Sequence, residues 1–145
     1  MQIELTKRAD GAGTLRCIRG DRSITWRPSP RPLHDLTRYA VEAVLQFSDG
    51  YWGRIANGSM TLDHDGAQPT GEAALSLRLS QKFDVELAGA IAWHASEMPA
   101  SEVVTEASLE RIRAYRDHLF RRWFELLPGE PLTLPWPASM ENDSQ

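Results

Sequence analysis

The sequence predicts an α+β fold in which a small antiparallel sheet packs against about three α-helices. Three observations lead to this prediction. Residues 1–28 alternate apolar and polar side chains between glycine-containing turns, which is typical of half-buried strands. Apolar residues then recur at helical spacing through most of residues 31–127, and a short alternating segment at 130–137 is a candidate returning strand. The 145 residues suffice for one hydrophobic core, so residues 1–145 are interpreted as a single domain.

The amino-terminal residues are expected to form a three-stranded meander. Strands are predicted near residues 2–8, 14–19 and 23–27, because glycine-containing segments around residues 10–13 and 20–21 interrupt the alternation and favour tight turns. The side chains predicted to face the core are Ile3, Leu5, Leu15, Cys17, Ile24 and Trp26.

A helix is expected to follow and to run to about Phe47. Three prolines between residues 28 and 32 end the third strand, since proline cannot donate to a ladder, and proline is also tolerated in the first turn of a helix. Gly50 is predicted to supply a left-handed cap at the end of this helix. Residues 51–58 are expected to add a short helical turn, and residues 61–71 a polar loop. The apolar face of the helix comprises Leu33, Leu36, Ala40, Val41, Val44 and Phe47.

Residues 72–96 allow two interpretations. Apolar side chains recur every four positions from Leu75 to Ile91, which favours a helix, whereas residues 75–79 alternate as a strand would. Length favours a helix through at least residues 80–95, and residues 72–80 stay open between helix and strand. The helical stripe comprises Leu75, Leu79, Phe83, Leu87 and Ile91.

The last helix has the clearest boundaries. Thr105 is a good N-cap, and Pro128-Gly129 ends the helix. Its predicted buried stripe comprises Leu109, Ile112, Leu119, Trp123 and Leu126. The returning strand at 130–137 is expected to join the amino-terminal sheet, and residues 138–145 are expected to form a flexible tail.

Composition narrows the classes of function. The single cysteine, Cys17, excludes an internal disulfide, and no apolar run approaches the length of a membrane span. The chain start lacks the pattern of a signal peptide, so a cytoplasmic location and no membrane partner are expected. Residues 1–40 hold eight basic and four acidic residues, a net charge of +4, whereas the whole chain carries −4. The acidic total argues against nucleic acid as a partner, and the arginines are interpreted as the solvent face of the sheet.

The segment LHDLTRYAVE, residues 33–42, contains the strongest candidates for chemistry. His34, Arg38 and Glu42 stand at i, i+4 and i+8, on one line at the edge of the apolar face, with Asp35 beside them. Imidazole and carboxylate groups ligate zinc or iron, and a metal-bound water can act as a nucleophile. Because Arg38 has no lone pair for a metal, such a site needs a further ligand such as Asp35, His64 or His94.

A structural role for the same residues is the alternative. Arg38 is then expected to bridge Asp35 and Glu42, and His34 to form a hydrogen bond near the helix start. Arg38, Tyr39 and Trp52 are weaker candidates for binding a ligand or an anion. Cys17 is interpreted as an inert core thiol, and His118 as solvated.

The same segment resembles a small family of uncharacterised bacterial proteins. Their corresponding helix reads close to Leu-His-Asp-Leu-Thr-His-Tyr-Ala-Val-Glu, and the likeness extends to IELTKRADGAGTLRCIR, SITW, LERIRAYRDHLFRRW and LPGEPLTLPWP in this chain. A weaker similarity links it to ubiquinone-biosynthesis proteins with a His-Asp-x-x-His metal motif. In both comparisons Arg38 stands where a second histidine is expected. The family resemblance supports the fold and implies no particular activity.

Three functions are consistent with these features. The first is a non-catalytic binding or interaction protein, with a homodimer among its forms, that uses the arginine-bearing face or an edge of the sheet. The second is a small metal-assisted hydrolase in which His34 is base or ligand, Asp35 orients it and Glu42 assists. The third is an RNA- or phosphate-binding module that uses Arg16, Arg19 and Arg27. No cofactor is predicted beyond the divalent metal of the second hypothesis.

Overall fold

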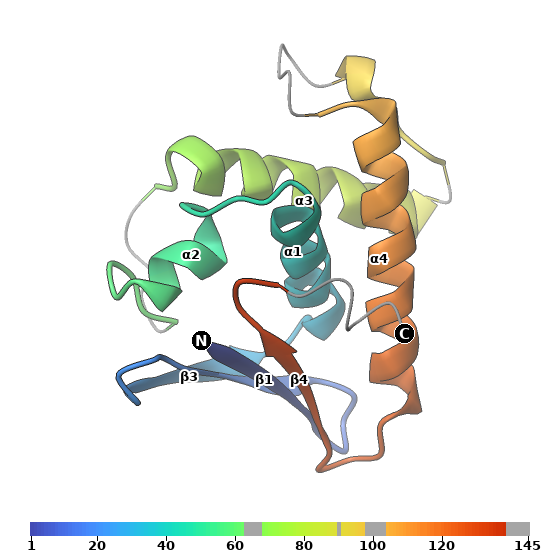
Figure 1. Ribbon diagram of the computed structural model, residues 1–145. Helices are drawn as coiled ribbons and strands as arrows, with labels where there is room; N and C mark the ends of the chain where they lie inside the picture. The colour runs from blue at the N-terminus through green and yellow to red at the C-terminus, as the bar shows by residue number, and fades with distance from the viewer. Residues whose placement is uncertain (63–67, 90, 98–103, 139–145) are drawn as a thin grey trace.

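The computed structural model describes residues 1–62, 68–89, 91–97 and 104–138. The fold is α+β, as predicted, with one four-stranded antiparallel sheet and its helices on one side of that sheet (Figure 1). The strands are β1 (Gln2–Lys7), β2 (Gly13–Ile18), β3 (Ile24–Ser29) and β4 (Pro131–Pro135). The helices are α1 (Pro32–Val44), α2 (Tyr51–Ala56), α3 (Gly71–Gly89) and α4 (Glu106–Glu125), with a 3₁₀ turn, η1 (Ala95–Glu97).

The sheet has the strand order β3-β2-β1-β4, and every pair is antiparallel. The predicted returning strand is therefore confirmed, because β4 pairs with β1 along its length. Ile3 lies opposite both Cys17 of β2 and Leu134 of β4, so these side chains form one row on the helix-facing side. All three are buried in the core.

Helix α1 lies at the centre of the helical layer, where it contacts both α3 and α4 (Figure 1). Its predicted apolar face is buried except for Leu33, which is half-buried. Helix α4 stands beside α1 and begins at Thr105 with a capping box, in which Thr105 Oγ1 accepts from Ser108 N at 3.1 Å. The predicted N-cap is thus confirmed.

The prediction that Ile24 and Trp26 face the core is wrong. Their side chains are 54% and 59% exposed, because Thr25 opposes Cys17 in the β2–β3 register and takes the inward position. In a strand, a shift of one residue moves every side chain to the other face. The inner side of β3 is instead polar, since Thr25, Arg27 and Ser29 meet polar groups of the helical layer.

The predicted end of the first helix is also wrong. Helix α1 ends at Val44, and the left-handed residue after it is Gln46, with φ of 58°, not Gly50. Gly50 has φ of −85° and is the N-cap residue of α2. The short helix expected at residues 51–58 is present as α2.

Residues 72–80 are helical, which decides between the two interpretations of that segment. Helix α3 ends at Gly89, however, so the predicted continuation to residue 95 is wrong. Ile91 lies beyond the helix and is 79% exposed, and Leu87 in its last turn is 49% exposed, so neither belongs to a buried stripe. His94 lies beyond the helix, and His118 is half-buried with its ring stacked on Tyr115, so it is not a fully solvated side chain.

Part of the polar loop, residues 63–67, and most of the predicted tail, residues 139–145, lie outside the described residues. Within the described ranges, none of the helices combines the length and the apolarity that a bilayer crossing requires.

Candidate functional site

The candidate residues of α1 do not converge on one centre. Glu42 contacts α2 and α3, Asp35 contacts β3, and His34 contacts α3. Each of the three therefore has its own local role, which the following contacts define.

Glu42 caps the amino terminus of α2. Its carboxylate accepts hydrogen bonds from the backbone nitrogens of Tyr51 at 2.9 Å and Trp52 at 3.0 Å, and from Ser76 Oγ at 2.5 Å. The side chain is fully buried, and this burial raises the pKa of Glu42 although the hydrogen bonds oppose the shift. Glu42 thus holds α2 and α3 to α1.

Arg38 is buried beside Glu42. Its Nε atom lies 3.6 Å from Glu42 Oε2, and its guanidinium donates to Ser76 Oγ and to the carbonyl oxygen of Ala73 at 3.0 Å. Burial lowers the pKa of Arg38, and the charge of Glu42 opposes this shift. The predicted bridge from Arg38 to Glu42 is therefore present, whereas Asp35 has a different partner.

Asp35 forms a bidentate ion pair with Arg27 of β3. The two hydrogen bonds measure 2.7 and 3.2 Å, Ser29 Oγ donates to the same carboxylate, and Arg27 also donates to Tyr51 Oη at 3.1 Å. Burial opposes the charge of Arg27, but the hydrogen bond and the charge of Asp35 raise the pKa of Arg27 above its ordinary value. This pair joins the sheet to α1 and α2.

The weaker ligand-binding candidates on α1 and α2 are core residues. Tyr39 is buried, and its hydroxyl donates to the carbonyl oxygen of Pro135 at 2.6 Å, which joins α1 to β4. Trp52 is buried edge-on against Tyr39, with ring centroids 6.3 Å apart.

Glu42 also borders a pocket, beside α2, but its side chain is fully buried, whereas His34 is partly exposed at a separate pocket. Its Nδ1 atom lies 2.5 Å from Asp84 Oδ2 of α3, and both side chains are about one-fifth exposed. An ionised carboxylate only accepts, so Nδ1 carries the hydrogen, and in a neutral imidazole Nε2 then holds the lone pair. No hydrogen bond to Nε2 forms within the described part of the chain.

The pocket beside His34 has a volume of about 420 Å³. It lies where the start of α1, the end of α3 and the end of α4 meet the β1–β2 turn. Its walls are largely apolar, and Arg31 stands at the rim, 3.3 Å from Asp84. The apolar lining includes Pro32, Leu33, Leu87, Trp123 and Phe124.

Asp84 could not be identified from the sequence. It is 50 positions from His34 and on another helix, so no spacing along the chain links the two. In the sequence, Asp84 stands out only as a polar residue next to the apolar Phe83, and many surface carboxylates have such a neighbour.

The structure brings no metal-ligating set together among the described residues, in which no group of three or more His, Cys, Asp or Glu side chains is close enough to hold an ion. His94 is exposed and lies 3.6 Å from Glu106, and His64 is outside the described residues. The divalent metal therefore stays a prediction from the sequence.

The arginines of the phosphate-binding hypothesis have protein partners. Arg16 donates to Glu4 at 2.7 Å on the solvent face of the sheet, and Arg19 donates to the carbonyl oxygens of Ile55 and Met60. Arg27 lies on the helix-facing side with Asp35. Of the three, Arg16 alone agrees with the predicted position on the open face of the sheet.

Comparison with protein-family models, with curated proteins and with solved structures gives no significant match. The resemblance to the bacterial family consequently stays a prediction, and function has to be argued from the geometry.

Proposed function

We propose that the protein is a non-catalytic binding protein whose ligand site is the pocket beside His34. The ligand is a small and largely apolar molecule with one hydroxyl or amide hydrogen, which donates to His34 Nε2. Binding pockets commonly combine apolar walls with a few fixed polar groups, and a volume of about 420 Å³ suits a small molecule.

The observation that carries this proposal is the contact between His34 Nδ1 and Asp84 Oδ2 at 2.5 Å. This contact fixes the orientation of the imidazole, and in the neutral imidazole it leaves Nε2 as a pre-positioned acceptor. The neighbouring walls from Trp123 and Leu87 exclude water from one side of such a ligand.

The other acid–base candidates support binding over catalysis. Asp35 and Glu42 are both buried and fully engaged in contacts that join helices and sheet. Among the described residues, a reaction in this pocket therefore has only His34, Asp84 and the exposed Arg31 available to it.

Titration with p-cresol, followed by NMR of the imidazole signals, tests the proposal. The chain has four histidines, so His→Gln variants assign each signal. We expect saturable shifts of the His34 signals, and affinity about fivefold weaker for toluene, which lacks the hydroxyl. His34→Gln should weaken p-cresol binding by a similar factor, and His94→Gln, at an exposed position, should leave it unchanged. Shifts confined to other histidines, or equal affinity for p-cresol in His34→Gln, would contradict the proposal.

The same hydrogen bond favours one second candidate, a hydrolase in which His34 acts on water. Nε2 would take a proton from water while the hydroxide oxygen attacks an ester carbonyl carbon. The carbon–oxygen bond to the leaving group then breaks, and the leaving alkoxide takes the proton back from Nε2. Asp84 would hold the imidazolium in place, as the orienting carboxylate does in catalytic triads.

Hydrolysis of p-nitrophenyl acetate separates the two candidates. A hydrolase should exceed the rate of an equal concentration of free imidazole, and His34→Gln should abolish this excess while His94→Gln keeps it. Elemental analysis of the same sample tests the metal-assisted form of this hypothesis. A rate that equals free imidazole would leave the binding protein as the better account.

A further inference from the structure

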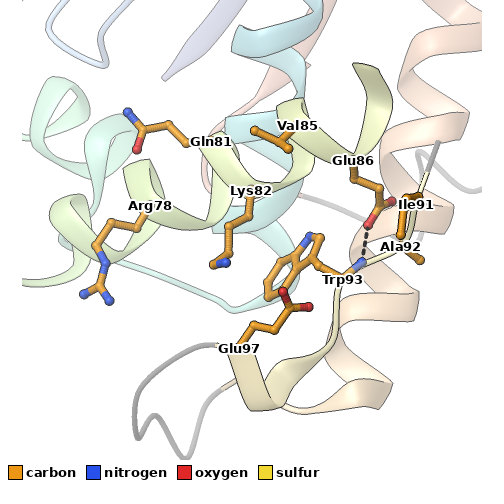
Figure 2. Close-up of a pocket in the computed structure, with 9 residues that line it drawn as sticks. All are labelled: Arg78, Gln81, Lys82, Val85, Glu86, Ile91, Ala92, Trp93 and Glu97. Carbon is orange, nitrogen blue, oxygen red and sulfur yellow. Dashed lines mark hydrogen bonds between the residues drawn. The ribbon is translucent and has the colours of Figure 1, made fainter. Parts of the chain in front are cut away.

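We propose a second ligand site on the outward side of α3, for an amphiphilic organic anion. The site is a pocket of about 560 Å³ between α3 and residues 91–97, shown in Figure 2. It uses residues 78, 82 and 85 of α3, whereas the His34 pocket uses residues 84, 87 and 88. The two sites are therefore independent, and this inference does not rest on the proposed function.

Two cations at this pocket have no anionic partner among the residues that the structure describes. Arg78 and Lys82 stand one helical turn apart on α3 and both line the pocket (Figure 2). In the described part of the chain, neither forms an ion pair with a carboxylate. An anion that lies between them would therefore gain two favourable charge contacts without displacing an existing one.

Glu86 is the carboxylate of α3 that lines the pocket, and arginines of α4 already pair with it. Glu86 accepts from Arg113 Nη2 at 2.9 Å, from Arg116 Nη1 at 3.4 Å and from the backbone nitrogen of Trp93. Burial opposes the charge of Glu86, but the hydrogen bonds and charges of the arginines lower its pKa below the ordinary value. Glu97, at the rim, accepts from His94 N at 2.7 Å.

The rest of the pocket is apolar. Val85 is 72% exposed, and Ile91 lies with Ala92 at the far end, beside the pocket floor formed by Trp93 (Figure 2). The indole Nε1 of Trp93 is buried and has no hydrogen-bond partner among the described residues, and Lys82 Nζ lies 5.4 Å from the indole ring centroid. Exposed apolar side chains next to free cations are complementary to a molecule with an anionic head and an apolar body.

The geometry thus points to one class of ligand, an aryl or alkyl carboxylate or sulfonate. Its head group would lie between Arg78 and Lys82, and its apolar part would cover Val85 and Ile91. This orientation follows from the order of the side chains, because Arg78 and Lys82 precede Val85 on α3, whereas Ile91 lies beyond the end of that helix.

The fluorescent sulfonate 8-anilinonaphthalene-1-sulfonate tests the site, with octanoate and octanol as competitors. We expect one saturable site on the folded chain, displacement by octanoate, and about fivefold weaker displacement by octanol, which lacks the charge. The double variant Arg78→Gln/Lys82→Gln should weaken dye binding by at least about fivefold, and Val85→Ser should also weaken it. Arg121→Gln, which removes an exposed arginine from α4, is the matched control and should bind as the wild type does.

Three results would overturn the proposal. One is undiminished dye binding by the double variant while its circular dichroism and melting temperature match the wild type. Another is equal displacement by octanol and octanoate. The third is loss of dye binding in His34→Gln, which would place the dye in the other pocket.

Discussion

Glu42 occupies the space that a side chain at Gly50 would need. A Cβ atom on Gly50 would lie 2.5 Å from Glu42 Oε1. Because Gly50 has no side chain, the carboxylate of Glu42 can reach the first two backbone nitrogens of α2. The acidic residue that the sequence offers for chemistry is therefore a buried cap, and its main effect is on stability.

Glu42→Gln should lower the free energy of unfolding by about 2–4 kcal/mol, because it leaves the buried Arg38 charge unpaired and weakens the cap of α2. Urea denaturation measures the effect, with Glu125→Gln at an exposed position of α4 as control. Replacing both members of the pair, as in Arg38→Met/Glu42→Gln, should cost less than the sum of the two single changes. Additive costs would show that the pair is not coupled.

Gly53→Ala should destabilise the protein by about 1–3 kcal/mol, since a Cβ there would overlap the carbonyl oxygen of Ser48, which belongs to the backbone. Gly20→Ala is the matched control, because no atom lies within 4 Å of its Cβ position and its φ is not in the left-handed region. Thermal melts of both variants check the prediction. Equal melting temperatures for Gly53→Ala and Gly20→Ala would mean that residues 48–53 can shift without a loss of stability.

The sheet and the helices could be predicted from local patterns, but the face of β3 could not. Period-2 alternation places Ile24 and Trp26 on one side of the strand and Thr25 on the other, and it does not say which side is covered. The choice depends on Asp35 and on the backbone of Leu62, which offer polar partners to the inner side of β3. These partners come from segments that the strand pattern does not include.

The candidate site shows the same limit. The segment LHDLTRYAVE correctly indicates residues that form specific polar contacts, since each of its charged side chains has a named partner. The spacing of residues along one helix, however, predicts contacts only between side chains of that same helix. The partners Arg27, Ser76 and Asp84 come from other elements, so the division of the cluster into separate contacts depends on tertiary packing.

Acid should destabilise the wild type partly through Glu86. Its pKa is lowered in the folded state by Arg113 and Arg116, so the unfolded chain binds more protons, and stability falls as pH drops below the ordinary pKa of a glutamate. Glu86→Gln removes this contribution. Urea denaturation at about pH 7 and about pH 4 should show a smaller loss of stability for Glu86→Gln than for the wild type. Parallel losses would contradict the assignment, and Glu125→Gln again serves as the exposed control.

Cys17 should be unreactive in the folded protein. The thiol is fully buried in the row between Ile3 and Thr25, and burial raises its pKa to about 12, although the charges of Arg27 and Arg19 oppose this shift. At about pH 8 almost no thiolate forms and no reagent reaches the sulfur, so Ellman's reagent should react only after unfolding. We expect one equivalent of thiol in concentrated urea and a slow rate without urea. Glu42→Gln should raise this slow rate by the same factor by which it raises the unfolded population. Rapid, complete reaction of the native wild type would show that the sheet opens locally at Cys17, and that the core between β2 and α1 is less stable than these contacts imply.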